Sequence, residues 1–218
     1  MTLLIQQNIG DDDLAIGCGS VIKLSSPQRG SDASYHLYSD DMQMHGGSGQ
    51  QIVTFAKDDP SSIKTLWQVR PKHHNEEGRE YPTQDNDDTC TKVAEPVKCG
   101  SIIRLTHMGT KTNLHSHGVK SPLSKQQEVT SYGQGDGKGD NGDNWLVECT
   151  GTYWLRKHPV RLQHIDTKGY LGASRQAVFN QNNCGGGCPI MNHLEAFGRK
   201  TKDELSVLEA DLGVYLHV

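Results

Sequence analysis

A phrase that occurs twice constrains the fold of this chain more than any other feature. The sequence reads "CGSVIKL" from Cys18 and "CGSIIRL" from Cys99. Self-similarity of this kind is typical of repeat architectures, in which one copy cannot bury its apolar face alone and neighbouring copies share a core. We therefore expect a fold assembled from several equivalent units.

The two copies continue in parallel through four short segments. These segments are VIKL, HLYS, QIVT and WQV in the first copy, and IIRL, NLHS, QEVT and WLV in the second. A weaker third copy begins with "VRL" at Val160 and continues through "GYLGAS" and "PIMNHLEAF". It closes with "ELSVLEADLGVYL", in which Leu205 is aligned with the tryptophans of the other copies.

Apolar and polar residues alternate within the segments. In "SIIRLTH", Ile103 and Leu105 share one face and Arg104 lies on the other, while His115 and His117 share one face of "NLHSH". A period of two over four to seven residues predicts strands. Three copies of four strands predict twelve strands, and the final segment is expected to be strand as well.

A closed all-β fold, the β-trefoil, fits this count best. Six strands form a barrel and three hairpins cap it, which leaves no long sheet edge. We expect a flexible N-terminal segment over 1–17 and one trefoil domain over 18–218, with repeats at about 18–97, 98–153 and 154–218. The predicted core residues are Ile22, Leu24, Ile103, Leu105 and Leu162.

Charge and hydropathy exclude several classes of protein. The chain has 22 basic and 26 acidic residues, a net charge of -4, and no cluster of lysine or arginine. A nucleic-acid or anionic-membrane partner is therefore disfavoured. No apolar run approaches ~20 residues, so no transmembrane helix is expected. The start "MTLLIQQNIGDDD" lacks the basic region of a signal peptide.

The three copies of "L-H-S-H…G-Q-Q-x-V-T…W" resemble MIR motifs, which occur in protein O-mannosyltransferases and in inositol trisphosphate and ryanodine receptors. "CGS" opens the first two repeats, and "LHSH…SPLS…QEV" follows in the second. With no membrane or catalytic region beside it, this pattern resembles the stromal-cell-derived factor two-like proteins from about Cys18 to Leu216.

The resemblance implies a small binding protein of the endoplasmic reticulum lumen, without enzymatic activity or cofactor. It implies partnership with a lumenal J-domain co-chaperone and BiP in the quality control of unfolded secretory proteins. The chain departs from the family in the insertion "NQNNCGGGC" and in its end, "YLHV", where a retention tetrapeptide is usual. "KDEL" at Lys202 is internal and is expected within a strand, so it is not a retention signal.

The histidines of "LHSH" are the main candidates for a binding site. His115 and His117 are expected on the outward face of a hairpin beside Asn113 and Gln127. Such polar donors can hold sugar hydroxyls, as in a lectin-like trefoil. The alternative is that these side chains brace the hairpin through hydrogen bonds to backbone. Repetition at Ser39 and Gln50 favours bracing.

Other motifs lack the residues that their chemistry requires. The stretch "GQGDGKGDNGD" fails as a phosphate loop and as a calcium-binding EF-hand, so it is interpreted as a hairpin loop. Cys184, Cys188 and His193 lack a fourth zinc ligand, and no metal site is expected. No nucleophile elbow or close carboxylate pair indicates a hydrolase.

The six cysteines are predicted to pair within repeats. Strands one and four of a trefoil unit are antiparallel neighbours, so the start of one lies near the end of the other. This geometry pairs Cys99 with Cys149 and suggests Cys18 with Cys90. The remaining pair, Cys184 and Cys188, would form a local disulfide or stay as free thiols. Six cysteines allow 15 connectivities, so the choice is a hypothesis that requires an oxidising compartment.

Overall fold

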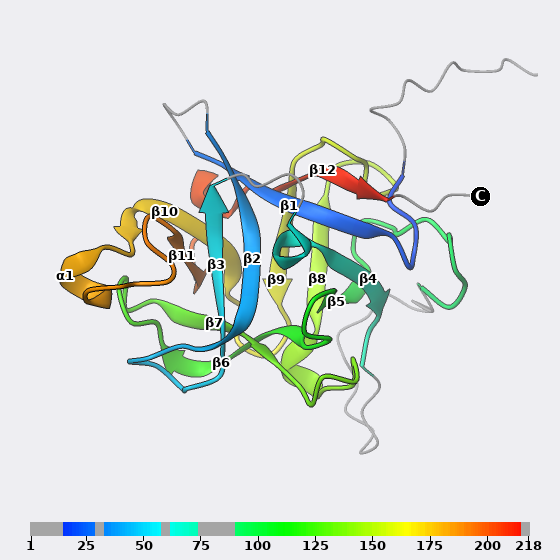
Figure 1. Ribbon diagram of the computed structural model, residues 1–218. Coiled ribbons are helices and arrows are strands. Elements are labelled where there is room, and N and C mark those ends of the chain that lie inside the picture. Colours follow the sequence, from blue (N-terminus) through cyan, green and yellow to red (C-terminus); the bar gives the residue numbers. More distant parts are fainter. Residues whose placement is uncertain (1–14, 29–32, 58–61, 74–89, 215–218) are drawn as a thin grey trace, which may run out of the picture.

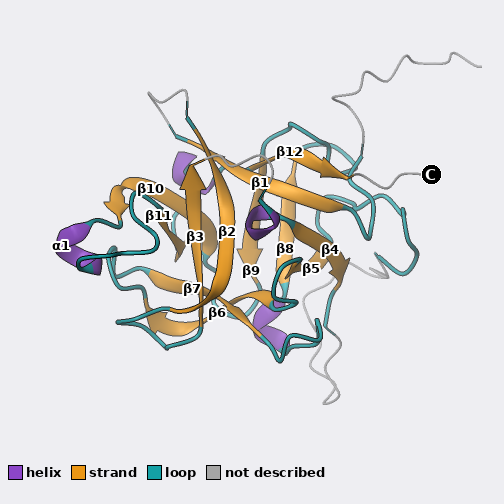
Figure 2. Cartoon of the chain, viewed as in Figure 1, coloured by secondary structure: helices purple, strands orange, loops and turns teal. Residues whose placement is uncertain are grey.

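The computed structural model describes residues 15–28, 33–57, 62–73 and 90–214, and strands dominate these ranges (Figures 1 and 2). The first repeat holds β1 (Val21–Pro27), β2 (Ser34–Gln43), β3 (Gln51–Lys57) and β4 (Trp67–Pro71). The second holds β5 (Ile102–His107), β6 (Asn113–Lys120), β7 (Gln127–Tyr132) and β8 (Trp145–Cys149). The third holds β9 (Val160–His164), β10 (Tyr170–Val178), β11 (Leu194–Arg199) and β12 (Glu209–Val214).

Two closed circuits of antiparallel pairs connect these strands. Six strands pair in the cycle β1–β4–β5–β8–β9–β12–β1, in which a single Val160–Leu208 bridge joins β9 to the start of β12. The remaining strands form the hairpins β2–β3, β6–β7 and β10–β11, and β3, β7 and β11 pair with one another in turn. This barrel with three capping hairpins is the predicted all-β trefoil.

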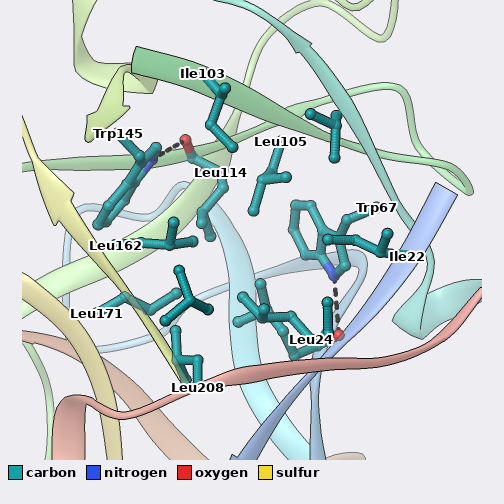
Figure 3. Packing of buried hydrophobic residues seen from close by; sticks show 14 of the residues in the cluster. Ile22, Leu24, Trp67, Ile103, Leu105, Leu114, Trp145, Leu162, Leu171 and Leu208 are labelled. Atoms are coloured by element: carbon teal, nitrogen blue, oxygen red, sulfur yellow. Dashed lines mark hydrogen bonds between the residues drawn. The ribbon is translucent and has the colours of Figure 1, made fainter. Parts of the chain in front are cut away.

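The core lies inside the barrel and joins all three repeats. The five predicted core residues, Ile22, Leu24, Ile103, Leu105 and Leu162, are all 0% exposed. Two indole N–H groups connect the barrel to the hairpins: Trp67 donates to the Leu37 carbonyl and Trp145 to the Leu114 carbonyl, each at 2.9 Å (Figure 3). The repeated tryptophan therefore fills the core and ties each hairpin to its own repeat.

The third repeat differs from the sequence-based alignment. Trp145 pairs with Ile103 in the barrel, and the equivalent partner of Val160 is Leu208. The prediction that Leu205 replaces the tryptophan is therefore wrong by three residues. Leu205 lies instead in a 3-10 turn, η4 (Glu204–Ser206), because the Asp203 side chain accepts a hydrogen bond from the Leu205 N–H. The expected strand across "KDEL" is replaced by this turn.

Three disulfides join the cysteines in the predicted pairs. Cys18 bonds to Cys90, Cys99 to Cys149 and Cys184 to Cys188, with Cα–Cα distances of 5.1, 5.2 and 5.4 Å. Cys99–Cys149 joins the chain just before β5 to the end of β8, and Cys184–Cys188 closes the inserted loop at the end of a short helix, α1 (Gln181–Cys184).

Some predictions concern residues beyond the described ranges. The flexible segment stays a prediction for 1–14 only, and the domain limits stay predictions, because 1–14 and 215–218 lie outside those ranges. Residues 15–17 are not flexible: Ile16 is 0% exposed, and its N–H donates to the Trp154 carbonyl at 2.8 Å. Most of the polar stretch that closes the first repeat, 74–89, lies outside them too. Within the ranges that are described, no helix has the length and apolar character needed to cross a membrane.

Candidate functional site

A cleft of ≈ 580 Å³ lies beside β6, where the sequence predicts the binding residues. His115 and His117 both line it, with Gln50 from the first repeat and residues of the β9–β10 turn from the third. The rings of His115 and His117 meet edge to face, with 5.3 Å between their centroids. Period-two alternation puts both histidines on the face of β6 opposite Leu114, which is buried in the barrel core.

His115 is oriented by a buried carboxylate. The Asp143 side chain is 0% exposed and accepts hydrogen bonds from His115 Nδ1 at 3.0 Å and from Asn113 Nδ2 at 2.9 Å. Because a carboxylate only accepts, Nδ1 is the donor nitrogen in this hydrogen bond. The ring also lies close to Gly142, where a Cβ would come within 2.2 Å of the ring carbon Cε1.

Asn113 lies beneath the cleft and does not face it. Its side chain is 0% exposed, and it accepts a hydrogen bond from the Thr106 hydroxyl at 2.6 Å while donating to Asp143 and to the Lys138 carbonyl. The prediction that His115 and His117 lie outward beside Asn113 therefore needs a correction: Asn113 does lie beside His115, but His115 is itself only 5% exposed. Asn113 supports the carboxylate that orients His115.

His117 connects two repeats through a second buried carboxylate. Its Nε2 lies 2.8 Å from Glu128 Oε2, and Glu128 is 0% exposed. Glu128 also accepts hydrogen bonds from the Ser48 N–H at the tip of the β2–β3 hairpin. His117 is 24% exposed, so it remains accessible from the cleft while it helps to hold this contact.

Gln127 braces its hairpin. Its amide donates to the Ser116 hydroxyl at 3.0 Å and to the His117 carbonyl at 2.9 Å. The first repeat contains the same brace, in which Gln51 donates to the Ser39 hydroxyl at 2.7 Å. For Gln127 the geometry supports the bracing interpretation over a direct role in binding.

Three cleft residues had no signal in the sequence. Tyr132 is 37% exposed at the end of β7, and Asp140 and Asp166 line the cleft from two loops. None of the three belongs to a segment that the repeats share, and Asp166 comes from a different repeat than the histidines. Only the folded arrangement of the hairpins brings them together.

The other two repeats carry different side chains at the equivalent positions. Hairpin pairing places Tyr38 and Asp40 of β2 where the second repeat has His115 and His117. In the third repeat, Gly172 and Ser174 of β10 occupy these positions. The Asp40 carboxylate accepts hydrogen bonds from the Tyr38 hydroxyl and from the Lys64 ammonium. Burial acts to raise the Asp40 pKa, but hydrogen bonds, above all the one from Lys64, lower it overall. The histidine pair therefore belongs to the second repeat alone.

A buried histidine supports the floor of the cleft. His164 Nε2 donates to the Gly142 carbonyl at 2.9 Å, and Nδ1 accepts from the Thr167 hydroxyl at 2.8 Å. Burial lowers the pKa of His164 to about 4, so the ring stays neutral near pH 7. His107 occupies the corresponding place beside Trp67, and burial likewise lowers its pKa to about 4.

One group of side chains could offer ligands to a metal ion. Ligand atoms of His115, Asp140 and Asp143 lie within 4.8 Å of one another. Both Asp143 oxygens already accept protein hydrogen bonds, from Asn113 and the Asp140 N–H on one and from His115 on the other. The group is therefore best described as a hydrogen-bonded support for the cleft.

The fold and this cleft define a class: a β-trefoil of MIR repeats with a polar cleft on one hairpin. The model of the MIR domain matches residues 28–153. The chain is 41% identical over 172 residues to a stromal cell-derived factor 2-like protein of Dictyostelium discoideum, covering 78% of this chain and 70% of the relative. It belongs to the stromal cell-derived factor 2-like family.

Further relatives agree over almost the whole chain. Human stromal cell-derived factor 2 is 34% identical over 203 residues, which covers 92% of this chain and 82% of the relative. The crystal structure of the SDF2-like protein from Arabidopsis thaliana superposes with a TM-score of 0.75 at 33% identity, covering 94% of this chain and 99% of that one. The likeness therefore includes the third repeat.

Proposed function

We propose that this protein is a non-enzymatic binding module of the endoplasmic reticulum lumen that acts with chaperones in protein folding quality control. Its partners would be a lumenal J-domain co-chaperone, BiP and unfolded secretory proteins. The observation that carries this proposal is the family likeness, which extends over 92% of the chain in the comparison with the human relative. The partners themselves come from the family resemblance.

The cysteines support the proposed location in the endoplasmic reticulum lumen. All six are paired in disulfides, and the structure contains no free cysteine among the residues it describes. Disulfides persist in oxidising compartments such as the endoplasmic reticulum lumen and are rare in the cytosol. A chain that uses every cysteine in this way fits a lumenal protein.

Affinity capture tests the proposal. The folded, oxidised chain is immobilised and exposed to an extract of endoplasmic reticulum lumen, and captured proteins are identified by mass spectrometry. We expect a J-domain protein and BiP to be retained. The control is the same chain reduced and alkylated, which should lose the J-domain protein. Retention of neither chaperone by the oxidised chain would contradict the proposal.

A lectin-like function is the second candidate, and the cleft favours it. The exposed Tyr132 ring offers an apolar face for a sugar ring, and Asp140 and Asp166 offer acceptors for hydroxyl groups. The His115 ring lies 5.0 Å from the Tyr132 ring and completes a polar and aromatic wall. Saccharides are recognised by this combination of stacking surface and oriented hydrogen-bonding groups.

A glycan array separates the two candidates. Under the lectin hypothesis, one glycan class binds saturably, and Tyr132→Ala reduces that binding while the melting temperature stays nearly unchanged. Tyr153→Ala is the matched control, because Tyr153 is 39% exposed but lies outside the cleft. Binding that both variants weaken equally, or no binding to any glycan, would reject the lectin hypothesis.

A further inference from the structure

The three hairpins of the trefoil meet at three junctions, and one junction differs from the others. At two of them a wholly buried glutamate holds a neighbouring hairpin turn. Glu128 of β7 accepts from the Ser48 N–H, and Glu195 of β11 accepts from the N–H groups of Leu123 and Ser124 at 2.6 and 2.8 Å. Strand register puts Ile52 of β3 at the equivalent position.

An apolar cluster replaces the carboxylate at the third junction. Because the Ile52 side chain cannot accept hydrogen bonds, the β10–β11 turn that meets it is held by packing and by the hydrogen bond between Thr54 and His193. The buried members of this cluster are Met44, Ile52, Phe179, Cys188 and Ile190. Figure 1 shows the turn, with α1, at the edge of the molecule beyond β10 and β11.

The cluster is open on one side. A cleft of ≈ 430 Å³ lies over it, and Met42, Met44, Phe179 and Ile190 contribute apolar walls. Methionine side chains adapt to ligands of different shape, which suits a site for varied apolar side chains. Cys184 also lines this cleft, so the Cys184–Cys188 disulfide forms part of its wall.

The loop that joins Cys184 to Cys188 is short and exposed. Gly185, Gly186 and Gly187 are exposed, and a Cβ on any of them would meet no atom within 4 Å. The cysteines of this pair are 4 residues apart, against 50 for Cys99–Cys149 and 72 for Cys18–Cys90. In the chain-entropy model, a disulfide that closes a shorter loop contributes less to the stability of the fold. Opening the loop disulfide is therefore the least costly of the three for the folded state.

We propose that Cys184–Cys188 is an exchangeable disulfide that oxidises cysteine pairs of unfolded polypeptides whose apolar side chains occupy the adjacent cleft. The substrate class rests on the proposed role in binding unfolded secretory proteins. The inference goes beyond binding, because it assigns a covalent reaction to the inserted loop.

The reaction balances without any further oxidant. A substrate thiolate attacks the Sγ of Cys184, the more exposed of the two cysteines, and the Cys184–Cys188 bond breaks. Cys188 leaves as a thiolate and takes up a proton. The second substrate thiol then attacks the mixed disulfide and releases Cys184 as a thiol. Substrate loses two hydrogens and becomes a disulfide, while the loop becomes a dithiol.

A stoichiometric assay on the oxidised full-length chain tests this inference. The probe is a reduced synthetic peptide with two cysteines and an adjacent leucine. After acid quenching and alkylation, mass spectrometry reads the state of every cysteine. We expect one peptide disulfide per protein and alkylation at Cys184 and Cys188 alone. A second peptide, with serine in place of leucine, should react at least about tenfold more slowly, because serine has no apolar side chain to bury in the cleft.

Controls make the outcome decisive. The double variant Cys184→Ser, Cys188→Ser should leave the peptide reduced. Equal oxidation by that variant, electrons delivered to Cys99–Cys149, or equal rates for both peptides would overturn the inference. If the variant fails to fold, the wild-type alkylation pattern is sufficient: alkylation at Cys184 and Cys188 supports the inference, and alkylation elsewhere contradicts it. If exchange is absent but chaperones are still captured, this inference fails and the proposed function stands.

Discussion

Replacing Leu105 with alanine tests whether the three repeats share one core. Leu105 is 0% exposed, and it belongs to the same buried cluster as Trp67 of the first repeat and Leu162 of the third (Figure 3). Barrel strands surround this cluster on all sides, so the walls cannot collapse fully onto the space that the missing methyl groups leave. We therefore expect a loss of about 3–5 kcal/mol, the upper part of the range for leucine-to-alanine changes.

The assay is equilibrium unfolding in denaturant and by heat. For a domain of this size, the expected loss corresponds to a melting temperature lower by roughly 6–20 °C. The matched control is Leu146→Ala on the neighbouring strand β8, where the side chain lies on the outward face and is only partly buried. That variant should lose well under half as much stability.

Cooperativity gives an independent test of the same variant. Far-ultraviolet circular dichroism and tryptophan fluorescence should report one coincident transition, because a shared core cannot melt one repeat at a time. The shared core would be refuted if Leu105→Ala lowered the free energy of unfolding by less than about 0.5 kcal/mol, well below the range for core leucines. Two separated unfolding transitions would also refute it.

Three other perturbations have defined outcomes. The pKa values of His107 and His164 are about 4 when folded against about 6.5 unfolded, so the unfolded state binds protons first as pH falls. The free energy of unfolding should therefore fall between pH ~6.5 and ~4, by up to ~1.4 kcal/mol per pH unit for each ring. In denaturant titrations, His107→Gln should reduce this pH dependence by the contribution of one ring. The double change of Cys99 and Cys149 to alanine should cost on the order of 4 kcal/mol, and a melting temperature equal to wild type would contradict it. Gly142→Ala should displace the His115 ring and lower the free energy of unfolding by about 1–3 kcal/mol. A crystal structure of the variant with His115 unmoved would exclude the clash.

The repeated phrase was sufficient to predict most of the fold. Strand alternation and copy number led to the trefoil, and the neighbouring ends of strands one and four led to Cys99–Cys149. The failure lay in the third repeat, where Leu205 and Leu208 both suit an apolar position. The cap at Asp203 decides between them: Ser62 and Asp140 cap the same turn before Trp67 and Trp145, and Asp203 stands at the same spacing before Leu208.

The candidate site was less predictable because its chemistry depends on contacts between repeats. Glu128 looks like an exposed strand residue in the sequence, yet it is buried and bonded to the Ser48 N–H, 80 residues away. His115 is a second case. It was expected on the outward face of its hairpin, but the buried Asp143 carboxylate supplies a partner for it and for Asn113 beneath the surface. Polar burial of this kind cannot be derived from local periodicity.

The most direct test of the proposed function is binding between two purified proteins. Titration calorimetry with a lumenal J-domain co-chaperone and the oxidised full-length chain measures their affinity and stoichiometry without other components. We predict saturable binding that free sugars do not displace and that reduction of Cys18–Cys90 and Cys99–Cys149 abolishes. Absence of binding by the oxidised, folded chain would contradict the account.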